Sequence, residues 1–213
     1  MDIKEFSIKN KKIVFIVFGL FLCFSLYYFG VYNSISDVTI ASSYKSYDDI
    51  SSLDKGAELI VIGSTAQDFE DREHKATFFD DGTLEDFYSL TNIKVNKVLK
   101  GADGIKNGDN LNIIEPASII QTVEGKQRLL RDDYQPLEKN KNYILFLKKN
   151  DNGQYSIINM NLGKLDLADK DKKFKMKNKD DKLMKDAFEK YLTESDDAIQ
   201  SYDETSETDT QQN

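Results

Sequence analysis

The sequence has few of the residues that covalent cross-links and many metal sites require. Among 213 residues there is one cysteine, Cys23, one histidine, His74, and no tryptophan. A single cysteine excludes an intramolecular disulfide. A zinc site made of several cysteine and histidine ligands is excluded for the same reason. The net charge of −8, without a concentrated basic face, argues against a nucleic-acid partner.

Charge is also missing from the whole stretch Ile13 to Tyr32. Roughly 20 apolar residues suffice for a helix to cross a bilayer. Four lysines precede this stretch, and the first charge after it is Asp37. The positive-inside rule therefore predicts a cytoplasmic segment at 1–12, a transmembrane helix at 13–32 and an extracellular remainder.

A cleaved signal peptide is the alternative for the same stretch. Its apolar region is usually about 7–15 residues long and is followed closely by small residues. Here the run is longer, and the nearest small-residue pattern, ending at Ala41, lies well beyond it. We therefore favour an uncleaved anchor, in which Cys23 serves as a small apolar residue. Its position also leaves S-acylation open.

The longest strand-like stretch changes its apolar face along its length. Tyr88 and Leu90 share one face, whereas Ile93 and Val95 share the other. Strand side chains alternate with a period of 2, so this change requires an extra residue. We predict a β-bulge at Thr91 or the residue after it, in a long bent strand of a small closed barrel.

Other segments complete a mainly β chain. Continuous apolar runs at 58–63 and 143–147 predict strands that are buried on both faces. Short strand patterns separated by turn residues are typical of a barrel or sandwich. The remaining segments are a polar stalk at 33–46, a β-barrel domain at 47–168, a loop at 127–142, a lysine-rich linker and amphipathic helix at 169–193, and a disordered acidic tail at 194–213.

The predicted C-terminal helix has an apolar face from Leu183 to Leu192. We expect this face to dock on the barrel or to self-associate, because the polar face is mixed in charge and so does not favour a membrane surface. The lysines between Lys170 and Lys179 alternate with aspartates. That mixture favours a solvated linker over a site for anionic polymers.

Candidate catalytic residues are sparse. His74 lies among charged residues, which predicts a solvated loop histidine. Nucleophilic catalysis would require a serine held against it. Ser64 and Ser89 are available, but neither lies in a G-x-S-x-G elbow. We therefore assign no catalytic residue. A hydrolase with an unrecognised acidic site is kept as a less favoured function, after the two that are given at the end of this subsection.

Two groups of carboxylates were weighed as calcium ligands, since calcium takes 6–8 oxygen ligands. Neither group has the spacing of an EF-hand loop. Solvated loops are the better interpretation, so we assign no metal and no cofactor site. The two groups comprise Asp68, Glu70, Asp71 and Glu73, and then Asp80 and Asp81.

The order of five short motifs resembles a known group of proteins. The motifs are Ala57–Gly63, Ile93–Gly101, Gly108–Ile114, Lys141–Leu147 and Gly163-Lys164. Together they resemble extracellular proteins of Gram-positive bacteria and, more distantly, the netrin-like or tissue-inhibitor-of-metalloproteinases-like form of the OB-fold. The resemblance implies a mainly β fold: a five-to-seven-stranded OB-like barrel with an N-terminal transmembrane helix and a C-terminal amphipathic helix.

The functional part of this resemblance does not transfer. Tissue inhibitors of metalloproteinases chelate the zinc of their target with a free N-terminal cysteine, whereas Cys23 here lies inside the anchor. A fold alone does not define a function. The sequence thus predicts a non-catalytic, membrane-anchored extracellular domain that binds an envelope protein or a cell-wall polymer. The alternative is an inhibitor or regulator of a cell-surface enzyme, acting through the exposed loop at 127–142.

Overall fold

The computed structural model describes residues 3–101, 104–170 and 178–192. The predicted acidic tail, most of the lysine-rich linker and the first two residues lie outside this described part. The chain divides into two compact units. The first combines Met1–Val38 with Ile119–Leu129, and the second combines Thr39–Ser118 with Leu130–Asn213.

The first unit begins with a long apolar helix. Helix α1 (Ile3–Tyr27) continues into one turn of π-helix, η1 (Tyr28–Tyr32). Within them Ile13–Tyr32 forms a 20-residue stretch with a mean hydropathy of 2.3 and no buried residue. It is the one helix of the described chain that is long and apolar enough to cross a membrane. The structure therefore contains the predicted apolar helix.

Most of a three-stranded sheet, in the order β1-β7-β6, also belongs to this unit. Its strands are β1 (Ile35–Ile40), β6 (Ala117–Thr122) and β7 (Gly125–Arg131). Two expectations are corrected here, because the predicted stalk at 33–46 contains β1 and the predicted loop at 127–142 begins inside β7. Both strands escaped detection because β1 is mostly exposed and polar and β7 is rich in charge.

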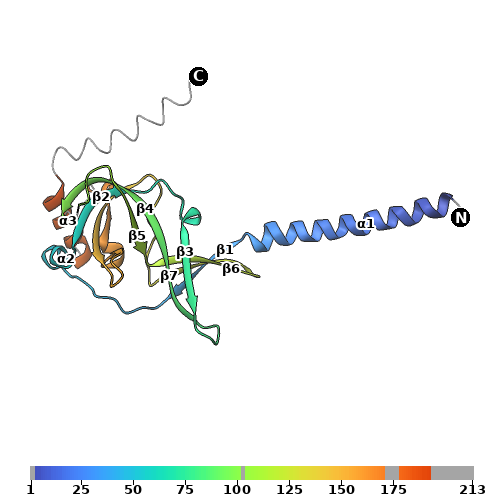
Figure 1. Cartoon of the computed structure of the whole chain (residues 1–213), viewed down its shortest axis with the longest axis horizontal. Coiled ribbons are helices and arrows are strands. Elements are labelled where there is room, and N and C mark those ends of the chain that lie inside the picture. The colour runs from blue at the N-terminus through green and yellow to red at the C-terminus, as the bar shows by residue number, and fades with distance from the viewer. Residues whose placement is uncertain (1–2, 102–103, 171–177, 193–213) are drawn as a thin grey trace, which may run out of the picture. The chain divides into compact units, whose positions relative to one another are not determined.

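The second unit is a closed five-stranded barrel with additional strands (Figure 1). Its strands pair in the circular order β2-β4-β5-β9-β8 and back to β2. All of these pairs are antiparallel except β5 with β9. This closure confirms the predicted OB-like barrel. The five strands are β2 (Leu59–Ser64), β4 (Leu84–Lys100), β5 (Asn110–Glu115), β8 (Asn142–Lys149) and β9 (Tyr155–Ile157).

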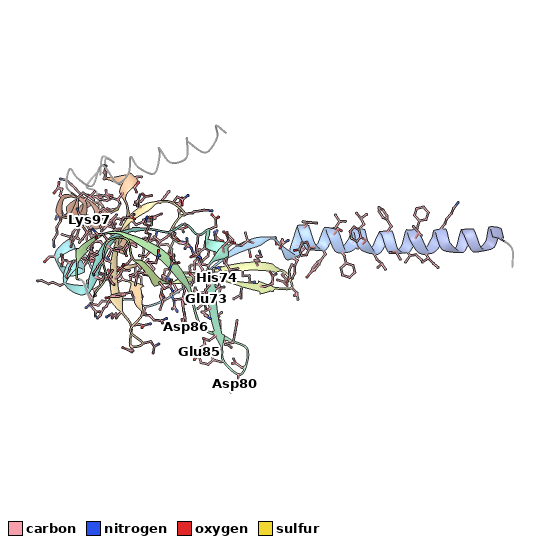
Figure 2. All side chains as sticks on the ribbon, turned by 45° about the horizontal axis from the view of Figure 1, so that its top comes forward. Glu73, His74, Asp80, Glu85, Asp86 and Lys97 are labelled. Carbon is pink, nitrogen blue, oxygen red and sulfur yellow. The ribbon has the colours of Figure 1, made fainter. Side chains whose placement is uncertain are left out.

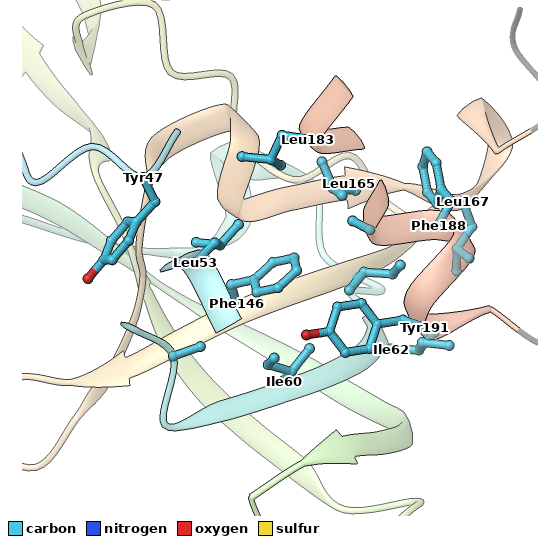
Figure 3. Close-up of a cluster of buried hydrophobic side chains, with 13 residues drawn as sticks. Tyr47, Leu53, Ile60, Ile62, Phe146, Leu165, Leu167, Leu183, Phe188 and Tyr191 are labelled. Carbon is cyan, nitrogen blue, oxygen red and sulfur yellow. The ribbon is translucent and has the colours of Figure 1, made fainter. Parts of the chain in front are cut away.

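Strands β2 and β8 are buried on both faces, as the apolar runs predicted. Their even-numbered residues, including Ile60 and Phe146, pack against helices α2 (Ile50–Gly56) and α3 (Lys179–Tyr191) (Figure 3). Their odd-numbered residues, such as Leu145, alternate into the barrel. Edge strand β10 (Lys164–Asp166) pairs with β8.

Helix α3 docks on the barrel with the apolar face that the sequence predicted. Leu183, Ala187, Phe188 and Tyr191 are all buried in the cluster. Asn178 caps the helix by accepting a hydrogen bond from the Asp181 backbone N–H at 2.8 Å. Of the two expectations for this helix, docking on the barrel is therefore confirmed.

A polar contact fastens the same helix to α2. The Asp54 carboxylate accepts hydrogen bonds from the Lys100 and Lys190 ammonium groups and from the Tyr191 hydroxyl. Burial alone would raise the pKa of Asp54, but these three donors lower it well below its usual value. The ionised carboxylate therefore links α2, α3 and the end of β4.

The position predicted for the β-bulge is wrong. Strand β4 pairs with β5 in unbroken register from Ser89 to Lys94. The register shifts instead where β4 pairs with β2, opposite Ile60/Val61 and Ile62/Gly63. The apolar pattern misled because Ser89 and Thr91, although polar, point inward in line with Phe87, Ile93 and Val95. The inward face of β4 therefore carries polar groups, and one of them, Thr91, belongs to a buried hydrogen-bond network.

Candidate binding site

A buried ion pair lies at the centre of that network. Arg72 and Glu115 have fully buried side chains, and Arg72 Nη1 lies 2.5 Å from Glu115 Oε1. Arg72 follows the short 3-10 helix η2 (Phe69–Asp71), and Glu115 ends β5. Thr91 also donates its hydroxyl to Glu115 Oε1 at 2.5 Å. The pair therefore joins three segments of the barrel unit.

The second oxygen of Glu115 holds the segment that follows β7. Glu115 Oε2 accepts hydrogen bonds from the Tyr134 hydroxyl at 2.6 Å and the Leu137 backbone N–H at 2.8 Å. Arg72 Nη2 donates to the Leu137 carbonyl at 2.5 Å. Burial, followed by the charge of Glu115, raises the pKa of Tyr134, so this phenol remains protonated and donates.

Among the described residues, one buried side-chain atom of the network and one beside it in β4 lack a hydrogen-bond partner. Arg72 Nε and Ser89 Oγ are buried without a hydrogen-bond partner. The Lys164 ammonium lies above the Tyr134 and Tyr143 rings, at 5.4 and 5.5 Å from their centroids. Burial lowers its pKa, and the charge of Glu115 opposes that change. No side chain of the central pair reaches solvent, so the network positions a surface rather than forming one.

A hollow of about 260 Å³ opens elsewhere on the barrel unit. Its volume lies just below the usual range of small-molecule pockets, and it suits one projecting group of a partner. The walls come from the segment before α2, from the residue after β5, from β8, from the end of β9, and from the chain between β9 and β10. The lining residues are Tyr44, Lys45, Tyr47, Pro116, Lys148, Ile157, Ile158, Asn159 and Met160.

Two lining residues adopt a conformation that side chains rarely take. Asn159 and Met160 have φ values of 62° and 51°, in the left-handed region. The Asn159 side chain bonds both backbone groups of Tyr47, accepting from its N–H at 3.0 Å and donating to its carbonyl at 3.1 Å. Strained residues persist only where the surroundings fix them, and they gather at functional sites. The Asn159 side chain therefore ties this wall of the hollow to the backbone of Tyr47.

The charges that line the hollow are all positive. Lys45 and Lys148 contribute ammonium groups, and no aspartate or glutamate is present in the lining. Within the described part of the chain, neither lysine forms an ion pair. This arrangement stands out in a chain of net charge −8. An apolar hollow with cationic walls favours a partner group that is acidic or carries an acidic neighbour.

A second exposed feature is the hairpin of β3 (Glu73–Phe78) and β4. Phe78 and Phe79 at its tip are 50% and 55% exposed. The turn is held by hydrogen bonds from the Phe79 N–H to the Thr83 carbonyl at 2.9 Å and from the Thr83 N–H to Asp81 at 2.8 Å. Figure 2 shows Asp80, Glu85 and Asp86 along this projecting arm. The hairpin thus presents two aromatic rings among carboxylates.

The structure corrects the interpretation of His74, which lies in β3 and not in a solvated loop. Its Nε2 lies 2.9 Å from the Phe69 carbonyl oxygen, and its ring meets the Phe69 ring edge-on. Burial lowers its pKa, with the Phe69 carbonyl opposing. Ser89 is the cross-strand neighbour of His74, yet Ser89 Oγ is fully buried and without a hydrogen-bond partner. The two do not form a nucleophile and base.

The candidate calcium ligands take part in local contacts. Asp68 pairs with Lys139 at 2.7 Å, and Glu73 pairs with Lys75 at 2.7 Å. Across residues 3–101, 104–170 and 178–192, no three His, Cys, Asp or Glu side chains are placed to hold a metal ion. Of the lysine-rich run, Lys179 pairs with Asp48 at 3.1 Å, and residues 171–177 lie outside the described part.

Comparison with known proteins adds no name to these features. No family model, curated protein or solved structure matches the chain. The candidate site therefore rests on geometry. The hollow was not predicted from the sequence because its walls come from segments more than 100 residues apart, and its only local signal is the Asn159-Met160 pair.

Proposed function

We propose that this chain is a membrane-anchored, extracellular binding domain without catalytic activity of its own. The observation that carries this proposal is the apolar hollow lined by two lysines, with a wall held by the Asn159–Tyr47 hydrogen bonds. The same chain has a stretch, Ile13–Tyr32, that is long and apolar enough to cross a membrane. The lysines before that stretch favour a cytoplasmic N-terminus and an outward-facing barrel. The partner is an envelope protein or cell-wall polymer with an acidic group beside an apolar one.

A second candidate function is regulation or inhibition of a cell-surface enzyme. The observation that favours it is the rigid β3–β4 hairpin with exposed Phe78 and Phe79. Aromatic anchors on a preorganised element are a common source of binding energy. The segment after β7 suits this role less well, because Tyr134 and Leu137 point into the buried network. The likeness to netrin-like domains stays a prediction, and the closed barrel is compatible with it.

Photo-crosslinking in the cells that express the chain tests both candidates. A benzophenone amino acid replaces Tyr44 beside the hollow, Phe79 at the hairpin tip, or Asp151 in an exposed turn as a control. We expect the Tyr44 position to give a discrete adduct that the Asp151 position lacks. Mass spectrometry then distinguishes a protein from a wall fragment.

Charge reversal at Lys45 and Lys148 provides the matched variant. We expect Lys45→Glu with Lys148→Glu to remove the Tyr44 adduct, because the acidic partner group would meet like charge. Phe78→Ser is the corresponding variant for the hairpin, because position 79 carries the crosslinker. Phe78 does not line the hollow. If position 79 forms an adduct with a single enzyme, and Phe78→Ser removes that adduct, the result would favour the regulator. If positions 44 and 79 behave like 151, the binding proposal fails.

A further inference from the structure

Hydrogen bonds at successive positions connect the hairpin of β6 and β7 to the end of the apolar helix. Furthest from the helix, Arg128 forms two hydrogen bonds with the Asp37 carboxylate, at 2.8 and 3.0 Å. Next, the Lys126 N–H donates to the Ser34 carbonyl at 2.7 Å. The hairpin therefore follows the chain back toward the helix (Figure 1).

The series continues past the end of the membrane-spanning stretch. Gln121 donates to the carbonyl of Tyr32, the last residue of the stretch, at 3.1 Å. At the hairpin turn, the Tyr27 hydroxyl donates to the Val123 carbonyl at 2.8 Å. Tyr27 lies five residues before Tyr32, on the other side of the π-helical turn that ends the apolar stretch. The turn therefore reaches the level of the helix tyrosines.

The turn itself is rigid and presents an apolar tip. Thr122 accepts a hydrogen bond from the Glu124 N–H at 3.1 Å and donates to the Gly125 carbonyl at 2.8 Å. Gly125 has φ +117°, and a Cβ there would lie 2.6 Å from Ser34 Oγ and 2.8 Å from the Val31 carbonyl oxygen. Only glycine permits this approach to the helix end. Val123 remains 78% exposed, the highest value among the exposed large apolar side chains.

We infer that the β6–β7 turn lies in the lipid headgroup interface, with Val123 against the acyl chains. Tyrosines near the end of a spanning helix lie at the level of the lipid headgroups. The hydrogen bond from Tyr27 to Val123 places the turn at the same level. An exposed valine gains free energy there by leaving water. Glu124, the one charged residue of the turn, can remain hydrated at the interface. The inference rests on the proposed membrane anchor and adds a second, peripheral contact with the same bilayer.

Single-cysteine labelling of the full chain in phosphatidylcholine vesicles tests this inference. In a Cys23→Ser background, an environment-sensitive fluorophore is attached to Val123→Cys, to Leu20→Cys within the helix, or to Ser36→Cys in exposed β1. Quenching by lipids with a nitroxide near the headgroup or deep in the acyl chain is then measured. We expect the label at position 123 to emit at shorter wavelength than that at 36 and to be quenched by the shallow nitroxide.

The Leu20 label separates failure of this inference from failure of the anchor. If the deep nitroxide quenches position 20 while position 123 behaves like 36, the interfacial turn is wrong and the anchor stands. If position 20 is not quenched, the anchor is wrong and the inference falls with it. Circular dichroism of each labelled variant, matched to that of the unlabelled chain, confirms that the fold is retained.

Discussion

Replacing Glu115 with alanine is expected to lower the free energy of unfolding by about 3–5 kcal/mol, since it leaves Arg72 buried without its partner. The loss also removes the acceptor of the Tyr134 hydroxyl and the Leu137 N–H. Urea unfolding of the purified chain measures the change. Limited proteolysis should then cut near residues 132–141, which the network no longer holds.

Two further variants show whether the ion pair is the cause. Asp68→Ala breaks an exposed pair with Lys139 and should cost roughly 0–1 kcal/mol. Arg72→Met combined with Glu115→Leu removes both charges and should cost less than the sum of the single replacements. A Glu115→Ala effect as small as that of Asp68→Ala would contradict the buried network.

Phe146→Ala is the second replacement with a large expected effect, about 3–5 kcal/mol. Phe146 is fully buried, and its ring meets the Tyr191 ring edge-on with centroids 5.7 Å apart. Truncation would leave a cavity between β8 and α3 at the centre of the cluster in Figure 3. The shift in the urea midpoint, at an unchanged slope, measures the loss.

Phe79→Ala is the matched control, because the same side chain is there 55% exposed. Surface replacements usually change stability by no more than about 0.5 kcal/mol. Equal losses of unfolding free energy at positions 79 and 146 would contradict the burial of β8 on both faces.

Local sequence patterns predicted the parts of the fold that local patterns determine. The apolar runs of β2 and β8 and the apolar face of α3 were each recognised in one window. The barrel was predicted from short strand patterns separated by turn residues and from a long bent strand, and the closed barrel is confirmed although the bulge position is wrong. Strands β1 and β7 were not recognised, since the apolar residues of both, and the charged residues of β7, do not alternate with a period of two. Their pairing depends on contacts such as Arg128 with Asp37, which lie 91 residues apart.

The buried network and the hollow could not be predicted from local sequence patterns, for the same reason. Arg72 and Glu115 are 43 residues apart, and Tyr47 and Asn159 are 112 residues apart. One signal was present but was misread. The prediction of a bulge follows from placing Ser89 and Thr91 on the solvent face, whereas both side chains point inward. Thr91 instead has a buried polar partner, because its hydroxyl donates to Glu115.

The most direct test of the account is the side of the membrane on which the barrel lies. Single cysteines at Ser7 and Asp151, in the Cys23→Ser background, are exposed to a membrane-impermeant maleimide in intact cells. We predict that Asp151→Cys is labelled at once, that Ser7→Cys is labelled only after permeabilisation, and that both proteins sediment with the membranes. Labelling of Ser7→Cys alone in intact cells, or recovery of the barrel in the soluble fraction, would contradict an extracellular domain held by an uncleaved anchor.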